Sequence, residues 1–248
     1  MDRILYTAAG GAARVMEQQN VISNNLANIN TVGFRQQLSA YRHAPFVGQE
    51  PALPTRVASV ASTPGSHMGQ GAMAETGHSL DVAIRGDGWF SVQTPQGEAY
   101  TRAGEFAVNQ NGQLVDMIGN PVLGEGGGPI EIPDRGTVTF ADDGQITALG
   151  AGDNPNDIQL LGRLKLVNPP ADQLERGENG LFRLAGGGVA PANETIKIAP
   201  GFLEMSNVNP AEAMVGMIAS ARRFELQMKV IQDASANAER ANSILSSQ

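Results

Sequence analysis

Acidic side chains in the middle of the chain are the first residues whose types and spacing could support chemistry. Asp81 lies close to Asp87, and Asp142 adjoins Asp143. Two carboxylates can act as general acid and base when a pocket brings them together and shifts one pKa. Here, however, Asp87 lies between two glycines, and Asp142 and Asp143 precede Gly144, patterns that are typical of tight turns. We therefore predict turns at both places.

Residues of the types that bind metals and phosphates also occur, but without the spacing these functions need. His67 and His78, with Glu75 and Asp81 nearby, lack the regular intervals of a metal site. The glycine-rich stretch GEGGGP (124–129) lacks the strand–loop–helix context and the Lys-Ser/Thr pair of a phosphate loop. With no cysteine in the chain, thiolate chemistry and disulfides are excluded. The sequence therefore predicts a protein that is not an enzyme and needs no cofactor.

Composition and charge narrow the class further. The chain has 248 residues, of which 41% are hydrophobic and 5% aromatic, with 30 glycines. This is enough apolar material for a core, and the glycines favour a turn-rich β protein with helical parts. Residues 1–42 carry a net charge of +2 and residues 210–248 are neutral, so the total of −8 leaves −10 on the middle. Such an acidic middle argues against nucleic acid as a partner.

Ordinary targeting signals are missing. No basic segment precedes an apolar one after Met1, so the sequence predicts no cleaved signal peptide. The apolar stretch EAMVGMIASARRF near the C-terminus is too short to cross a bilayer. These signals alone predict a cytoplasmic protein without direct membrane insertion.

Both ends of the chain show helical periodicity. Near the N-terminus, steps of three and four residues give one face that is apolar except at Gln19: Leu5, Ala8, Ala12, Val15, Gln19, Ile22, Leu26 and Ile29. The C-terminal stripe runs through Met217, Ala221, Phe224, Met228, Ile231, Ser235, Ala238, Asn242 and Leu245. Asn209, Pro210 and Glu212 predict a capped start for the second helix. The first helix should end near Asn30, before a turn at Gly33.

Such helices can pair within one globule or assemble with several partners. Polar residues interrupt each stripe, and buried polar positions can determine register and partner number. We favour assembly, and expect a substitution of Gly33 by valine to impair assembly more than folding of the middle. The predicted assembly residues are Leu5, Val15, Ile22, Asn25, Leu26, Asn28, Met217, Ala221, Phe224, Met228, Ile231 and Leu245, with Gly33 at the turn.

The middle of the chain has strand rather than helix character. Residues 106–115 and 138–147 resemble each other, each with a glycine that can take the positive φ of a hairpin turn. We predict an α+β fold in which two long terminal helices form a coiled-coil-like helical domain, with a central antiparallel β-rich domain between them in the sequence. The expected ranges are 1–30 for the N-terminal helix, 31–78 for an extended connector, 79–200 for the β-rich domain, and 201–248 for the C-terminal segment and helix.

Three long stretches carry a resemblance to a known family. They are SNNLANINTVGFR (23–35), LDVAIRGDGWFSVQTPQGEAYTRAGEFAVNQNGQLVDMIGNPVLG (80–124) and LEMSNVNPAEAMVGMIASARRFELQMKVIQ (203–232). Together they resemble the N-terminal, β-domain and C-terminal signatures of the flagellar basal-body rod and hook proteins. Trp89, where the distal rod protein usually has phenylalanine, and the stretch ARRFELQMKVI make the chain most similar to a proximal rod member.

The resemblance implies a non-enzymatic structural subunit of the proximal rod. Its terminal helices would line an inner tube that transmits torque and leaves a channel for export, with other rod subunits as partners. It also implies passage through the flagellar type III export apparatus to the periplasm without a cleaved signal, which replaces the cytoplasmic prediction. The asparagines of residues 20–30 would bridge backbones of neighbouring subunits. A distal rod protein and a coiled-coil-oligomerised carbohydrate-binding β module are the alternatives, although one Trp and three Tyr are few for sugar binding.

Overall fold

The computed structural model describes residues 2–39, 41–45, 57–61, 65–133, 137–149, 158–177 and 179–246, with the backbone alone for residues 2–4, 41–45, 57–61, 241 and 244–246. Contacts divide the chain into two compact units. The helical unit comprises Met1–Asn28, Gln36–His67 and Val208–Gln248, and the β unit comprises Ile29–Arg35 and Met68–Asn207. Neither unit is continuous in sequence, because the segment after the first helix belongs to the β unit and the next segment returns to the helical unit.

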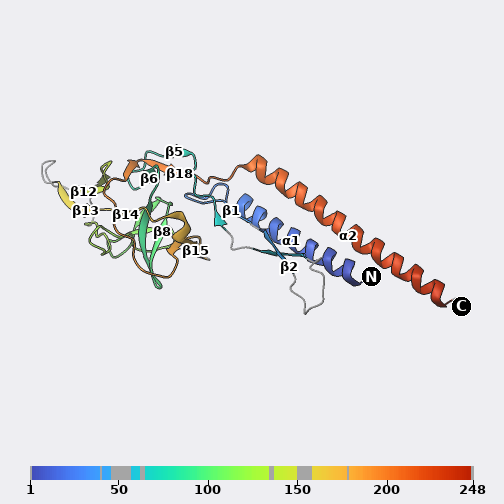
Figure 1. Cartoon of the computed structure of the whole chain (residues 1–248). Helices are drawn as coiled ribbons and strands as arrows, with labels where there is room; N and C mark the ends of the chain where they lie inside the picture. The colour runs from blue at the N-terminus through green and yellow to red at the C-terminus, as the bar shows by residue number, and fades with distance from the viewer. Residues whose placement is uncertain are drawn as a thin grey trace. The chain divides into compact units, whose positions relative to one another are not determined.

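Two helices dominate the helical unit, α1 (Asp2–Ala27) and α2 (Pro210–Ser246). They run antiparallel side by side (Figure 1), with Gly11 facing Gln227 and Gly216 facing Ile22. The predicted cap of α2 is confirmed, since the Asn209 side-chain oxygen accepts hydrogen bonds from two backbone N–H groups at 3.0 and 3.3 Å. The structure shows a helix pair, and coiled-coil geometry stays a prediction.

The stripe predicted on α1 is the face that packs, whereas the stripe predicted on α2 is rotated from the packed face. All eight predicted positions are buried or half-buried, although the last, Ile29, lies beyond the end of α1. On α2 the less exposed positions recur at Ala213, Met217, Ser220, Phe224, Gln227, Ile231, Ala234 and Ala238. Ala221, Met228, Ser235 and Asn242 are exposed instead. The packed face of α2 includes small residues such as Ser220, which is 1% exposed. Small side chains let two helix backbones approach closely, but a hydrophobicity pattern selects positions with larger apolar side chains.

Short strands complete the helical unit. Strand β2 (Tyr41–Pro45) pairs antiparallel with β3 (Val57–Ala61), and β1 (Gln37–Leu38) pairs antiparallel with β4 (Gly65–Ser66). Asn25, 4% exposed, donates from Nδ2 to the carbonyl oxygen of Gln37 at 2.9 Å and accepts the Gln37 N–H at 2.8 Å. The amide of Asn25 therefore bonds its own chain, and its expected role as a bridge to a neighbouring subunit stays a prediction.

Antiparallel strands build the β unit around one main sheet and several smaller pairings. The main sheet has the order β14-β7-β8-β16-β15. Its strands are β14 (Leu166–Val167), β7 (Trp89–Thr94), β8 (Gly97–Thr101), β16 (Phe182–Leu184) and β15 (Leu174–Arg176). A second sheet comprises β11 (Thr137–Phe140), β12 (Gln145–Leu149) and β13 (Gln159–Arg163). The remaining pairs are β9 (Phe106–Val108) with β10 (Leu114–Asp116), β6 (Val82–Arg85) with β17 (Lys197–Pro200), and β5 (Met73–Glu75) with β18 (Phe202–Glu204). One short helix, η1 (Ala171–Gln173), precedes β15.

Both predicted hairpins are confirmed. In the first, β9 pairs with β10, and Gly112 has φ 74°. In the second, β11 pairs with β12, and Gly144 has φ 88°. The Asp143 carboxylate accepts the N–H of Gln145 at 3.1 Å, so the adjacent acidic residues form a turn, as expected from the glycine that follows them.

Two apolar clusters hold the β unit together. The larger packs around the fully buried side chains of Ile84, Phe90 and Leu114. The smaller consists of Trp89, Tyr100, Val167, Phe182 and Ala190. Residues alternate between faces along a strand, so Trp89 and Phe90 of β7 serve different clusters. The second face of this sheet is therefore also covered.

Tyr100 should make the stability of the β unit sensitive to alkaline pH. Burial raises the pKa of Tyr100, the hydrogen bond from the Ala190 N–H lowers it, and the charge of Glu98 adds to the rise. A raised pKa in the folded state gives stability that is complete below the unfolded value of about 10 and is lost as pH rises through the folded value. We expect denaturant unfolding to show a steeper loss of stability above about pH 10 in wild type than in Tyr100→Phe. Parallel pH profiles would contradict this.

Candidate functional site

The segments that follow α1 and precede α2 lie beside each other in the β unit. We call residues 31–35 the N-terminal connector and residues 203–207 the C-terminal connector. The N–H of Gly33 donates to the backbone oxygen of Glu204 at 2.7 Å, and the N–H of Asn207 donates to the Phe34 oxygen at 3.3 Å. Stretches far apart in the sequence thus form one structural feature.

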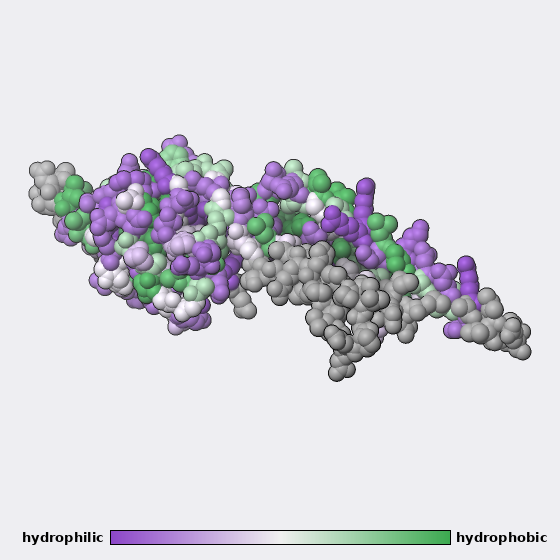
Figure 2. Space-filling model, viewed as in Figure 1, coloured by the Kyte–Doolittle hydropathy of each residue, from purple (hydrophilic) through white to green (hydrophobic). Residues whose placement is uncertain are grey.

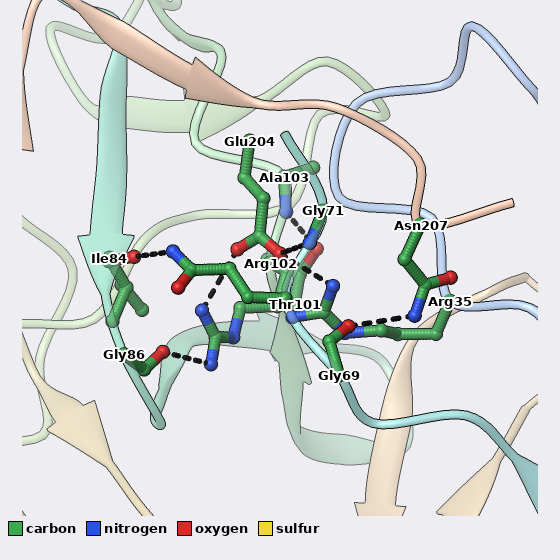
Figure 3. A network of polar contacts seen from close by, with 11 residues as sticks. Arg35, Gly69, Gly71, Ile84, Gly86, Thr101, Arg102, Ala103, Glu204 and Asn207 are labelled. Atoms are coloured by element: carbon green, nitrogen blue, oxygen red, sulfur yellow. Dashed lines mark hydrogen bonds and ion pairs between the residues drawn. The ribbon is translucent and has the colours of Figure 1, made fainter. Parts of the chain in front are cut away.

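A buried carboxylate lies at the centre of this feature. The Glu204 side chain is fully buried, and its Oε1 accepts from Arg35 Nη1 at 2.5 Å and from the Gly71 N–H at 2.8 Å. Its Oε2 accepts from Arg102 Nη1 at 2.9 Å. Figure 3 shows both guanidinium groups close to the carboxylate. We refer to Arg35, Gly71, Arg102 and Glu204 as the Glu204 network.

This network contains more positive than negative charge. Arg35 and Arg102 share one carboxylate, and Arg35 Nε and Nη2 and Arg102 Nε have no hydrogen-bond acceptor within the described residues. Burial lowers the pKa of Arg102, Glu204 raises it, and the neighbouring charge of Arg35 lowers it. The Trp89 ring centroid lies 5.8 Å from Arg35 Cζ and 5.6 Å from Arg102 Cζ. An indole face attracts cations, so Trp89 offsets part of the charge imbalance.

The guanidinium group of Arg176 stacks on aromatic rings beside the N-terminal connector. Arg176 Cζ lies 4.5 Å from the Phe34 ring centroid and 5.7 Å from that of Phe182. Its Nη1 also donates to the backbone oxygen of Arg35 at 2.6 Å. The Phe182 and Trp89 ring centroids are 4.7 Å apart. Aromatic rings and guanidinium groups therefore form a continuous, largely buried cluster against the N-terminal connector.

Gly33 has the conformation that the sequence predicts. Its φ is 67°, a region that residues with a Cβ rarely adopt. A Cβ at this position would overlap the backbone nitrogen of Ala103 and the carbonyl carbon of Arg102. Gly33 therefore has two roles. It allows the turn, and it lets the N-terminal connector pack closely against the segment that follows β8.

The predicted assembly residues of the helical unit divide by exposure. Half-buried side chains are Leu5, Val15, Ile22, Leu26, Asn28, Met217, Phe224 and Ile231, while Asn25 is buried. Ala221 is exposed and Met228 is 37% exposed. The side chain of Leu245 lies outside the described residues. Asn28 donates from Nδ2 to the Asn24 backbone oxygen at 2.9 Å, as expected for a helix end. Membership of an assembly interface stays a prediction for this whole set.

Hydrophobic side chains also lie on the opposite side of α2. Val215, Ile218 and Leu226 are 67%, 57% and 64% exposed. At 100° per residue they lie away from the stripe that faces α1. Figure 2 shows hydrophobic patches alternating with hydrophilic ones along the helical unit. One chain therefore leaves part of α2 apolar and uncovered.

Comparison with known proteins identifies the family. Residues 5–35 match the model described as flagella basal body rod protein, residues 83–148 the flagellar hook protein FlgE/F/G D1 domain, and residues 199–244 the flagellar basal body rod FlgEFG protein C-terminal. The chain is 48% identical to flagellar basal-body rod protein FlgF of Escherichia coli (strain K12), over 99% of each chain. The chain belongs to the flagellar basal-body rod protein family.

Other rod proteins agree with this assignment. FlgF of Salmonella typhimurium is also 48% identical over 99% of each chain. FlgG of Bacillus subtilis (strain 168) is 33% identical over 93% of this chain and 94% of its own. The chain is FlgF-like along its whole length. The two rod matches at the chain ends include both connectors, and thus Arg35 and Glu204 of the network.

Two of the acidic and histidine residues considered in the sequence, His78 and Asp81, lie close to each other. Within the described residues, no group of three or more His, Cys, Asp or Glu side chains is arranged to hold a metal ion. His78 Nδ1 lies 3.6 Å from Asp81 Oδ2, and the same Asp81 oxygen accepts from the Thr76 hydroxyl at 2.6 Å. No described helix has the length and apolar character required to cross a bilayer.

No local sequence pattern predicts Glu204, Arg102 and Trp89 as partners of Arg35. One signal pointed to part of the network. Arg35 and Glu204 are opposite charges within the two terminal stretches that resemble the rod family, and each follows an apolar residue. A buried charge needs a partner, so the pairing was a reasonable candidate. Arg102 gave no such signal, because its neighbours are polar or small.

Proposed function

We propose that this proximal rod subunit polymerises through its two terminal helices, which build a drive shaft that transmits torque and a channel for export. The assignment as a structural subunit of the rod follows from the family. The proposal for how the subunit assembles rests on the exposed apolar side of α2, where Val215, Ile218 and Leu226 lie. Exposed apolar patches on a soluble chain commonly mark protein–protein contacts.

The helix pair supports this arrangement further. One side of α2 packs on α1 through small and half-buried residues such as Ser220 and Phe224, while the other side has no partner within the described residues. Polar side chains of Arg222 and Lys229 lie among the apolar ones there. A helix with two apolar sides is suited to packing between its own partner and neighbouring subunits.

Partners and location follow from the same proposal. The contacts are with other rod subunits, and the chain reaches the periplasm through the flagellar type III export apparatus without cleavage of a signal peptide. The subunit acts by its shape and contacts, without catalysis or a cofactor. The 48% identity to FlgF of Escherichia coli and of Salmonella typhimurium exceeds the 33% identity to FlgG of Bacillus subtilis, which favours a proximal over a distal rod position.

A matched pair of valine substitutions tests the assembly surface. Val215 on α2 and Val189 in the β unit are 67% and 63% exposed. Replacing either by aspartate should change the free energy of unfolding of the monomer by only about 0.5 kcal/mol, as for other surface changes. Only Val215→Asp should abolish swimming and rod assembly, because it places a charge where a neighbouring subunit must pack. Wild-type swimming by Val215→Asp would contradict the proposed surface.

A further inference from the structure

We infer that Glu204 is a lock that fastens both helical connectors to the β unit, so that order in the N-terminal connector depends on the C-terminal connector being in place. The inference concerns a single chain and is independent of the proposed assembly. It explains why a carboxylate and two guanidinium groups are buried in a protein whose function requires no charged site. The lock would act before any subunit meets a neighbour.

The hydrogen bonds show the dependence of one connector on the other. Three bonds of the N-terminal connector end on the C-terminal connector: Gly33 N–H to the Glu204 oxygen, Arg35 to the Glu204 carboxylate, and the Phe34 oxygen from the Asn207 N–H. Arg35 and Glu204 are separated by 169 positions in the chain. These three bonds form only once residues 203–207 have docked, whereas the bond from Arg176 to the Arg35 oxygen is independent of them.

The C-terminal connector has its own attachments to the β unit. Strand β18 pairs with β5 through Leu203 and Ala74, and the Met205 N–H donates to the Ala72 oxygen at 2.8 Å. Asn207 Nδ2 donates to the Gly69 oxygen at 2.7 Å (Figure 3). This connector can dock without the N-terminal one, and it then presents the carboxylate that Arg35 needs. Within the described residues, the N-terminal connector has one backbone hydrogen bond of this kind, from Arg176 to the Arg35 oxygen, so we infer that the C-terminal connector docks first.

The negative charge of Glu204 is what holds the two connectors in place. The Glu204 carboxylate separates two buried cations, Arg35 and Arg102, and the Gly71 N–H points at the same oxygen as Arg35. A neutral side chain at this position leaves two like charges without compensation in a buried site, which is strongly unfavourable. Asp87 favours the charged form of Arg102, but this carboxylate is exposed. The cations would therefore separate, and Arg35 would take the N-terminal connector with it.

Hydrogen exchange on the full-length unassembled chain tests this lock. Glu204→Gln keeps the shape of the side chain and removes its charge. We expect the amides of Gly33 and Gly71 to exchange at least tenfold faster than in wild type. The amides of Leu114 and Val122, in the main core, should stay within about twofold. Unchanged exchange at Gly33 would overturn the inference.

A second buried carboxylate provides the matched control. Glu98 is 6% exposed at its side chain and contacts Lys165 Nζ at 2.8 Å in the same unit. Glu98→Gln should leave exchange at Gly33 unchanged, because Lys165 has no described contact with either connector. If Glu98→Gln accelerates Gly33 as much as Glu204→Gln does, the effect is general destabilisation and the lock is wrong.

A milder variant decides the question if Glu204→Gln does not fold. Trp89→Phe keeps an aromatic ring but weakens the attraction of the ring for both guanidinium groups, since indole is the strongest cation–π partner. We expect exchange at Gly33 and Gly71 to rise about two- to fivefold, with Leu114 unchanged. Equal acceleration at all three amides, or none, would overturn the inference.

Discussion

Replacing Gly33 by alanine should destabilise the β unit by about 2–5 kcal/mol, the sum of a backbone term and a steric term. The positive φ of 67° costs a residue with a Cβ about 1–2 kcal/mol. The new methyl group would also overlap the backbone of Ala103 and Arg102. Backbone atoms cannot rotate away as a flexible side chain can, so the connector or the segment after β8 must move.

Gly77 separates the two terms. Its φ is 71°, nearly the same as that of Gly33, but no atom lies within 4 Å of the position of an added Cβ. Gly77→Ala should therefore cost only the backbone term of about 1–2 kcal/mol. Denaturant unfolding of both variants measures the difference directly. Equal losses would show that the close approach of Gly33 to Ala103 has no energetic importance.

The contact with Ala103 changes the expected consequence of substitutions at Gly33. The turn alone predicts that valine impairs assembly more than folding of the middle. Because Gly33 packs within the β unit, we now expect the same substitution to weaken that unit as well. Unfolding of Gly33→Val that matches wild type, together with lost swimming, would favour the original expectation.

Truncating Phe224 to alanine should abolish incorporation into the rod. A fully buried phenylalanine loses about 3–5 kcal/mol on truncation. Phe224 is half-buried in the single chain, within the stripe that packs on α1. We therefore expect only part of this loss in the monomer and the remainder on assembly, where it recurs in every subunit. Motility and rod assembly of the variant, with thermal unfolding of the monomer, measure the two parts.

Leu226 is the control for Phe224→Ala in the monomer. It lies on the same helix but is 64% exposed, so Leu226→Ala should change monomer stability by about 0.5 kcal/mol at most. The core of the β unit, around residues such as Phe90, should melt as in wild type in both variants. Normal rod assembly by Phe224→Ala would show that this face of α2 is not needed. A collapsed β unit would show that the two units do not fold separately.

Sequence alone determined the features that depend on neighbouring residues. The cap at Asn209, the end of α1 shortly before Asn30 and the hairpin turns at Gly112 and Gly144 arise from local hydrogen bonds and backbone conformation. These interactions span only a few positions, so the residue types that make them are adjacent in the sequence. The α1 stripe was also predictable, because its packed positions carry mostly apolar side chains.

Tertiary structure decided the features that depend on distant partners. The packed face of α2 follows small residues such as Ser220, because the approach of α1 selects the side chains that fit between two backbones. The amide of Asn25 bonds Gln37, because β1 brings that backbone within reach. Arg35, Arg102 and Glu204 gather on one site only when segments up to 169 positions apart have docked. Sequence patterns report local propensity, whereas a buried charge is tolerated only through the partner that folding places beside it.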